Sequence, residues 1–109
     1  MPISEAEFQR QVLQLAKLCG WRRAHFRPGL TQSGRWVTPV QGDGQGFPDL
    51  VLVHPGRGLL LFVELKTDKG RETTEQRAWL EALARAGARA ETWRPRDWPH
   101  IERVLKGEA

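Results

Sequence analysis

Apolar residues at the start of the chain recur every three or four positions, which is the spacing of one buried helix face. These positions are Phe8, Val12, Leu15, Ala16 and Cys19. Ser4 and Glu7 have the spacing of an N-terminal capping box. Gly20 follows the last apolar position and is a common helix terminator. The pattern predicts a first helix between Ser4 and Gly20.

Three further runs are short and rich in apolar residues, which is typical of strands. They cover residues 21–26, 49–53 and 59–66. Residues 59–63 are apolar at every position, so we expect this strand to lie in the centre of a sheet. Residues 54–58 contain two glycines and a proline. This short linker suits a turn between two antiparallel strands.

The second half of the chain predicts a helix, a strand and a short terminal helix. Thr73 and Gln76 have capping-box spacing at the start of the helix, and Gly87 ends it. Its inner face is predicted to carry Trp79, Leu80, Leu83 and Ala86, with Trp79 in the core. Residues 88–93 form the next predicted strand, and residues 97–105 the last helix. A helix that crosses between two strands implies that they pair in parallel.

Residues 27–47 form a long predicted loop rich in glycine, with a short extended piece at residues 35–37. Loops of this length in a small domain commonly have a function. Trp36 in this loop is a candidate for stacking on a base or for stabilising a dimer. Asp43 is interpreted as a turn residue.

The composition fits one compact domain covering residues 1–109. A formal net charge of +4 and a pI near 10.0 favour polyanionic partners. No apolar run is long enough to cross a bilayer, and the polar N-terminus does not resemble a secretory signal. Cys19 is the single cysteine and has no internal disulfide partner, so we expect a cytoplasmic protein.

Two carboxylates and a lysine carry the candidate chemistry. Glu64 and Lys66 are two positions apart and therefore share one face of the strand at 59–66. Asp49 begins the preceding strand, and antiparallel pairing brings it near the end of its partner. We expect the three side chains to converge at one edge of the sheet.

Carboxylates and backbone carbonyls are the ligands that Mg²⁺ and Mn²⁺ prefer. Asp49, Glu64 and the carbonyl of Leu65 could therefore hold such a cation, and Lys66 could stabilise negative charge on a phosphate. Two simpler interpretations stay open: Asp49 as a turn residue, and Glu64 with Lys66 as an exposed ion pair.

The sequence around these residues resembles the VRR-NUC branch of the PD-(D/E)XK nucleases. The resemblance rests on Gly46-Phe47-Pro48-Asp49, on Glu64-Leu65-Lys66 and on Gln76 in the following helix. The valine-arginine-arginine signature of the family is not literal here, because Glu64-Leu65-Lys66 stands in that slot, as in stand-alone, phage-like members. The resemblance implies an α/β restriction-endonuclease-like fold, with an α-β-β-β-α-β core and a mixed sheet flanked by helices.

The resemblance also implies the roles of the site residues. Asp49, Glu64 and the Leu65 carbonyl would be ligands of Mg²⁺ or Mn²⁺, and Lys66 would be the catalytic lysine. Gln76 would support the site, with helix capping as the alternative or additional role. A glutamate of the first helix would reach the metal through water. Glu7 is the first choice despite its capping position, and Glu5 is the second.

The implied partner is DNA, with branched, flap or junction substrates and a homodimeric enzyme. Basic residues in two groups are candidates for phosphate binding, with a solvated surface as the alternative. The groups are Arg22, Arg23, His25 and Arg27, and Lys69, Arg71 and Arg77. Two rival functions are a non-catalytic DNA-binding module with this fold and a small protein-interaction domain.

Overall fold

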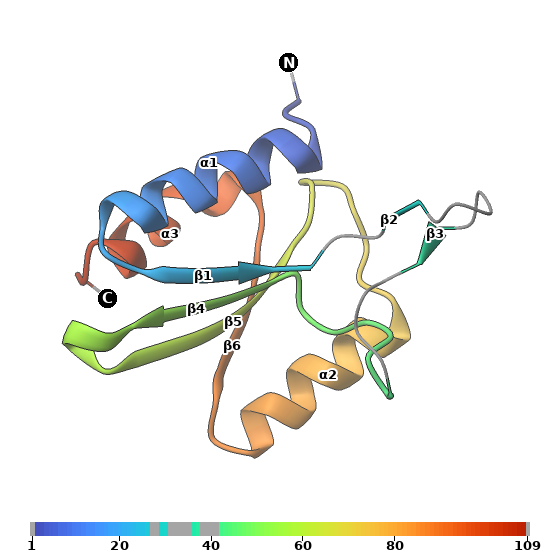
Figure 1. The fold of residues 1–109 in the computed structure, drawn as a ribbon. Coiled ribbons are helices and arrows are strands. Elements are labelled where there is room, and N and C mark those ends of the chain that lie inside the picture. The colour runs from blue at the N-terminus through green and yellow to red at the C-terminus, as the bar shows by residue number, and fades with distance from the viewer. Residues whose placement is uncertain (1, 27–28, 31–35, 38–41, 109) are drawn as a thin grey trace.

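The computed structural model describes residues 2–26, 29–30, 36–37 and 42–108. A four-stranded mixed sheet has the strand order β1-β4-β5-β6. Helices α1 (Glu5–Leu18) and α3 (Trp98–Leu105) lie on one face of this sheet, and α2 (Thr74–Arg85) lies on the other (Figure 1). The predicted fold class, a mixed sheet flanked by helices, is confirmed.

The strands follow the predicted order with small changes at their ends. They are β1 (Arg22–His25), β4 (Leu50–His54), β5 (Leu59–Leu65) and β6 (Arg89–Trp93). β5 is central: it pairs antiparallel with β4 and parallel with β6, as predicted. The β4–β5 turn is a short 3₁₀ helix, Pro55–Arg57, and a second one, Pro95–Asp97, precedes α3.

The glycine-rich segment between β1 and β4 contributes a small second sheet. Strands β2 (Gly29–Leu30) and β3 (Trp36–Val37) pair antiparallel. The extended piece predicted at residues 35–37 therefore corresponds to β3 over its described positions. Arg27, one of the candidate phosphate-binding residues, lies outside the described residues.

The buried core lies between the sheet and the α1–α3 layer. It includes Phe8 and Val12 of α1, Leu61 and Val63 of β5, and Ile101 of α3. The alternation of β5 sends Leu61, Val63 and Leu65 to this side, where all three are fully buried. Glu64 must therefore point to the opposite, α2 side of the sheet.

The prediction that Trp79 belongs to the core is wrong. Helix α2 contains no buried residue, and Trp79 is half-buried. Its ring packs edge-on against Phe47 with 5.0 Å between centroids, and its indole N–H donates to the carbonyl of Asp43 at 2.9 Å. The buried tryptophans are instead Trp21 and Trp93. Periodicity shows that a helix has an apolar face, but it does not show how completely the sheet covers that face.

In the described part of the chain, no helix combines the length and apolar character needed to cross a membrane.

Candidate active site

Asp49 stands immediately before β4, next to the last residues of β5. The β4–β5 register pairs Leu50 with Val63, so one further step sets Asp49 opposite Glu64. Asp49 Oδ2 accepts a hydrogen bond of 2.8 Å from the backbone N–H of Leu65. The bond fixes the Asp49 carboxylate across the end of β5, and it gives this residue a more specific role than that of a simple turn former.

Glu64 is the one charged residue among the described residues with a fully buried side chain, at 0% exposure. While both acids are ionised, neither carboxylate oxygen of Glu64 has a hydrogen-bond partner. This burial excludes the interpretation of Glu64 as half of an exposed surface ion pair. A buried carboxylate without donors is unstable as a free anion, so the site must provide a proton or a cation to neutralise it.

The surroundings of Glu64 raise its pKa to about 9. Burial is the largest cause, followed by hydrogen bonding to the Asp49 side chain and the negative charge of Asp49; the charge of Lys66 opposes the shift. A hydrogen bond between two carboxyl groups requires that one of them holds a proton. The pair therefore binds a proton tightly when no other cation is present.

A pocket of about 400 Å³ opens beside this pair. Its lining residues come from α1, from the ends of β1, β4 and β5, and from α2: they are Glu5, Ala6, Gln9, Phe26, Asp49, Lys66 and Gln76. The fold thus brings Asp49, Lys66 and Gln76 to one cavity, although they are widely separated in sequence. Phe26 was not expected here; its backbone N–H donates to the carbonyl of Asp49 at 3.0 Å.

The first helix presents Glu5 to this pocket, while Glu7 points elsewhere. Glu7 forms an ion pair with Arg10 on the helix surface, and its pKa is lowered chiefly by that hydrogen bond. Positions 5 and 7 differ by about 200° around a helix, so both side chains cannot face the same cavity. The preference for Glu7 over Glu5 as the acid at the site therefore does not fit the geometry.

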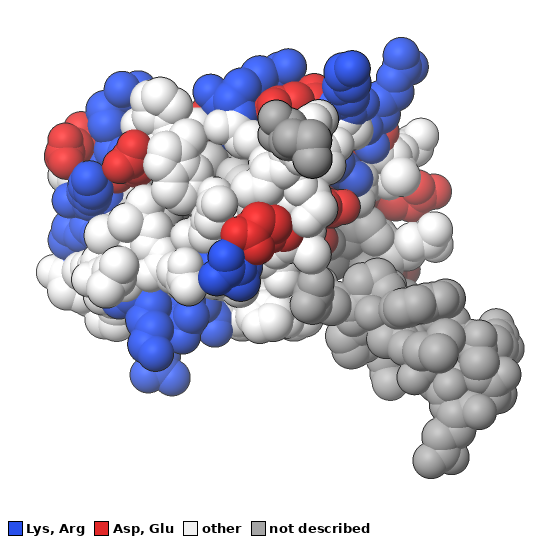
Figure 2. Space-filling model, turned by 90° about the horizontal axis from the view of Figure 1, so that it is seen from above, with Lys and Arg blue, Asp and Glu red and all other residues white. Residues whose placement is uncertain are grey.

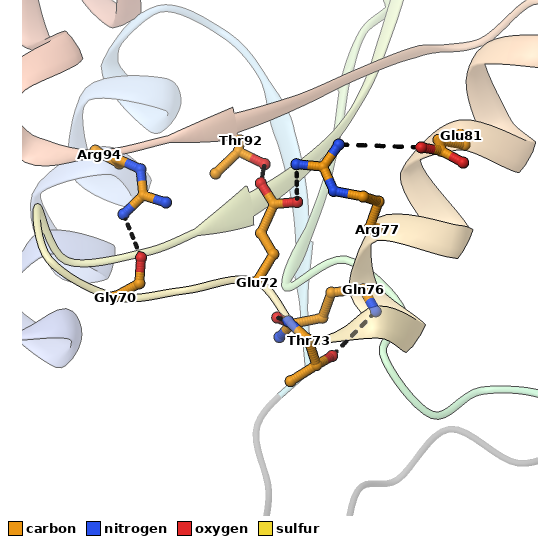
Figure 3. Close-up of polar contacts among 8 residues, drawn as sticks. All are labelled: Gly70, Glu72, Thr73, Gln76, Arg77, Glu81, Thr92 and Arg94. Atoms are coloured by element: carbon orange, nitrogen blue, oxygen red, sulfur yellow. Dashed lines mark hydrogen bonds and ion pairs between the residues drawn. The ribbon is translucent and has the colours of Figure 1, made fainter.

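Gln76 combines the two roles that the sequence left open. Its Oε1 accepts a hydrogen bond of 2.8 Å from the N–H of Thr73, and Thr73 Oγ1 accepts one of 3.1 Å from the N–H of Gln76 (Figure 3). This reciprocal capping box fixes the side chain of Gln76 at the start of α2. The same side chain lines the pocket beside Asp49 and Lys66.

The basic residues near the site do not form one cluster. Arg22, Arg23 and His25 are all exposed on β1, but alternation places Arg23 and His25 on the α1 side of the sheet and Arg22 on the other. Lys69 and Arg71 are exposed beyond β5. In the view from above, basic side chains lie mainly around the rim of the described surface and are interspersed with acidic ones (Figure 2).

Arg77 already has partners within the protein. Its guanidinium lies 3.2 Å from Glu72 and 4.0 Å from Glu81. A phosphate at this position would have to compete with both carboxylates. Arg77 is therefore a weaker candidate for DNA binding than Lys69 or Arg71.

The donor set fits a hard divalent cation in part. Within the described ranges, no group of three or more histidine, cysteine, aspartate or glutamate residues is close enough to hold a metal ion. Asp49 and the two unpartnered oxygens of Glu64 nevertheless offer hard oxygen ligands, and magnesium ions commonly bind to one or two carboxylates while keeping several waters. The residues present are compatible with such an ion.

Comparison with known proteins gives two matches. The family model of the VRR-NUC domain matches residues 8–97. A solved structure described as "VRR_NUC domain protein" superposes with a TM-score of 0.61 at 21% sequence identity, covering 97% of this chain and 88% of that chain. At this identity the structural match supports the fold alone. No curated protein matches the sequence.

Proposed function

Because the chain belongs to the VRR-NUC family of restriction-endonuclease-like nucleases, we propose that it is a metal-dependent enzyme that hydrolyses DNA phosphodiester bonds. The observation that carries the proposal is the buried Glu64 carboxyl, which has no donor and lies beside Asp49 and a pocket lined by Lys66. A module that only bound DNA would gain nothing from two acids that repel phosphate.

Asp49, Glu64 and the backbone carbonyl of Leu65 would hold Mg²⁺ or Mn²⁺. Such a cation polarises a phosphate and lowers the pKa of bound water. The hydrogen bond from the Leu65 N–H keeps the Asp49 carboxylate aimed across the strand end. Lys66 sits at the same pocket, where its ammonium group offsets the negative charge that develops on the phosphate and orients the attacking water.

Gln76 and Glu5 complete the proposed site from two helices. The capping bond occupies Gln76 Oε1 and leaves its amide N–H₂ as a donor that can orient water or a phosphate oxygen. Glu5 lines the same pocket from α1 and takes the role first expected of Glu7, which is to reach the metal through water.

The substrate that we propose is branched or structured DNA, which the resemblance to stand-alone family members implies. We also propose that the domain acts as a homodimer, because two-fold symmetry would present two active sites to two strands. Lys69 and Arg71, which are exposed and follow Lys66 closely in the chain, would contact phosphates. On β1, contacts would come from the face that meets the DNA, which carries either Arg22 or the pair Arg23 and His25.

The test compares the wild type with Asp49→Ala, Glu64→Ala and Lys66→Ala on linear, flapped and four-way DNA, with Mn²⁺ and with a chelator. The matched control is Asp43→Ala, which removes a carboxylate outside the pocket. We expect metal-dependent cleavage of at least one branched substrate by the wild type and the control. We expect the other three variants to lose at least about 100-fold in rate.

Two outcomes would contradict the proposal. Cleavage that persists in Glu64→Ala would show that the catalytic centre lies elsewhere. DNA binding without cleavage and without any response to metal would support the non-catalytic module instead. Cross-linking and sedimentation in solution would test the homodimer separately.

A further inference from the structure

We propose that Arg94, which directly follows β6, is a positioning residue for Lys66. This inference rests on the proposed nuclease function. It concerns the segment of residues 66–76, which begins with Lys66 and ends with Gln76. Residues 67–73 of this segment belong to no helix or strand. Gln76 is fixed by its own capping box with Thr73. The turn that follows Lys66 has no such device, so contacts from outside the segment must hold it in place.

The guanidinium of Arg94 binds the turn that follows Lys66. Its Nη1 donates to the carbonyl of Thr67 at 2.6 Å. It also donates to the carbonyl of Gly70 at 2.6 Å (Figure 3). The N–H of Gly70 also donates to the Thr67 carbonyl at 3.2 Å, so the turn is closed on itself and then attached to Arg94. Bonds from a charged donor are shorter and stronger than neutral ones.

This turn touches the side chain of Lys66. A Cβ atom placed on Gly70 would lie 3.5 Å from Lys66 Cδ and 3.0 Å from Thr67 Oγ1. Gly70 therefore lies beside the aliphatic stem of the lysine, and a side chain added there would come into contact with that stem. A shift of the turn would change the space available to the Lys66 stem, and with it the position of the ammonium group.

Neighbours of Arg94 bind the rest of the segment in the same way. The N–H of Arg96 donates to Asp68 Oδ1 at 3.0 Å. Thr92 Oγ1 donates to Glu72 Oε1 at 2.7 Å, and Glu72 in turn faces Arg77 on α2. The end of β6 thus holds the segment at its beginning and near its end, and among these side-chain contacts the bond from Arg94 to Thr67 is the closest in sequence to Lys66.

Arg94 is itself held rigidly. Its backbone N–H donates to Asp97 Oδ2 at 2.9 Å, and it follows Trp93, which is 1% exposed. The N–H of Lys66 donates to the carbonyl of Trp93 at 3.0 Å. Arg94 therefore extends from a fixed backbone position toward the turn, which is the arrangement expected of a residue that acts through another.

The test uses the full chain with Arg94→Met, which keeps the length of the side chain and removes its donors, and Arg94→Lys, which restores a charged donor. Arg89→Met is the matched control. Arg89 lies on the same strand and donates to Glu91 at 2.6 Å, outside the pocket. The readouts are kcat and KM on the branched DNA that the wild type cuts, together with calorimetric Mn²⁺ affinity and hydrogen exchange of residues 66–76.

We expect Arg94→Met to lower kcat about 10- to 100-fold, because small misplacements of catalytic groups cost rates of this size. Mn²⁺ affinity should stay within about twofold of wild type, because the β4–β5 pair holds Asp49 and Glu64. KM should rise by a smaller factor than kcat falls, because Lys69 and Arg71 lie in the loosened segment. Exchange should accelerate in residues 66–76, and Arg94→Lys should recover part of kcat. Arg89→Met should have the kcat of the wild type, even if the substitution lowers the stability of the fold.

A purely structural role predicts a different result: a lower melting temperature in Arg94→Met with kcat of the folded protein unchanged. That result would overturn the proposal. If Arg94→Met does not fold, Arg94→Lys decides through the two readouts together: a kcat that falls as exchange of residues 66–76 accelerates supports the proposal, and a wild-type kcat with accelerated exchange overturns it. A wild type that cuts no DNA would refute the nuclease function itself, so the two failures are distinguishable.

Discussion

Asp49 and Glu64 lie opposite each other at the end of the β4–β5 pair, where burial and the neighbouring Asp49 carboxyl raise the pKa of Glu64 to about 9. Two carboxyl groups so placed cannot both be ionised cheaply unless a cation accompanies them. Lys66 offsets part of this charge but does not remove the shift. The site is therefore built at the expense of the stability of the metal-free protein, and that cost can be measured.

The first prediction concerns the pH dependence of stability without metal. Below pH 4.5, the usual pKa of glutamate, Glu64 is protonated in both folded and unfolded states. As pH rises toward about 9 the unfolded chain ionises and the folded one does not, so the folded state loses stability. Glu64→Gln should therefore become increasingly more stable than wild type, by up to about 1.4 kcal/mol per pH unit. Denaturant titrations in chelator measure this difference.

Glu91 provides a control, because its pKa is shifted in the opposite direction to that of Glu64. Burial opposes its ionisation, but hydrogen bonds from Trp93, His100 and Arg89 hold its pKa below the usual value. The contribution of ionised Glu91 to the stability of the folded state is present above the usual pKa of glutamate. It is lost as the pH falls through the lowered pKa of Glu91. Glu91→Gln should thus be less stable than wild type at neutral pH. If the pH profiles of wild type and Glu64→Gln are parallel, the buried-acid interpretation is wrong.

The second prediction is that Mg²⁺ raises the melting temperature, and does so more strongly at higher pH. A cation must displace the proton shared by Asp49 and Glu64, so its affinity increases until the pKa of about 9 is passed. At a concentration a hundred times Kd, the gain is about 2.7 kcal/mol, or roughly 10 °C for a domain of this size. Thermal shift assays at two pH values measure it. An equal shift in Glu64→Gln would place the metal elsewhere.

The sequence predicted the sheet and its layers well because the strands differ clearly in their apolar patterns. β5 is apolar on both faces in its first half, which identified it as central. The helix between β5 and β6 identified their parallel pairing. The convergence of Asp49, Glu64 and Lys66 followed from alternation and antiparallel pairing, both of which are local rules.

Other features of the site depend on contacts that periodicity does not specify. Glu5, the second choice from the sequence, could have been preferred to Glu7, because it lies three positions before the buried Phe8 and so continues the inner face of α1. The half-buried position of Trp79 could not have been predicted, since it depends on how far α2 covers the sheet. The contacts of Arg94 with Thr67 and Gly70 join residues more than twenty positions apart and have no sequence signal.

The third prediction concerns Gly46, which lies three residues before Asp49 and packs closely against the backbone at the start of α2. Its φ is +82°, and a Cβ there would lie 2.6 Å from the backbone carbon of Glu75 and 2.7 Å from the N of Gln76. Gly46→Ala should lower the free energy of unfolding by about 2–4 kcal/mol, through left-handed strain and a backbone clash. Denaturant unfolding monitored by tryptophan fluorescence measures the loss.

Gly42 is the matched control for this change. It has a φ of +71°, but a Cβ added there would meet no described atom within 4 Å. Gly42→Ala should therefore lose only the strain contribution, about 1–2 kcal/mol. Equal losses in the two variants would mean that Gly46 does not pack tightly against α2.

The fourth prediction separates the two acids of the first helix. Glu5 lines the pocket with Asp49 and Lys66, whereas the Glu7 carboxylate pairs with Arg10. Under the proposed function, Glu5→Gln should therefore reduce the rate of metal-dependent cleavage about 10-fold or more, because the carboxylate proposed to reach the metal through water is lost. Glu7→Gln removes the same charge from the same turn of helix and should leave the rate unchanged, because the exposed pair of Glu7 with Arg10 lies outside the pocket. Single-turnover cleavage at saturating Mn²⁺ measures both rates. The opposite ranking would restore Glu7 as the acid of the site and would require α1 to rotate from its present orientation.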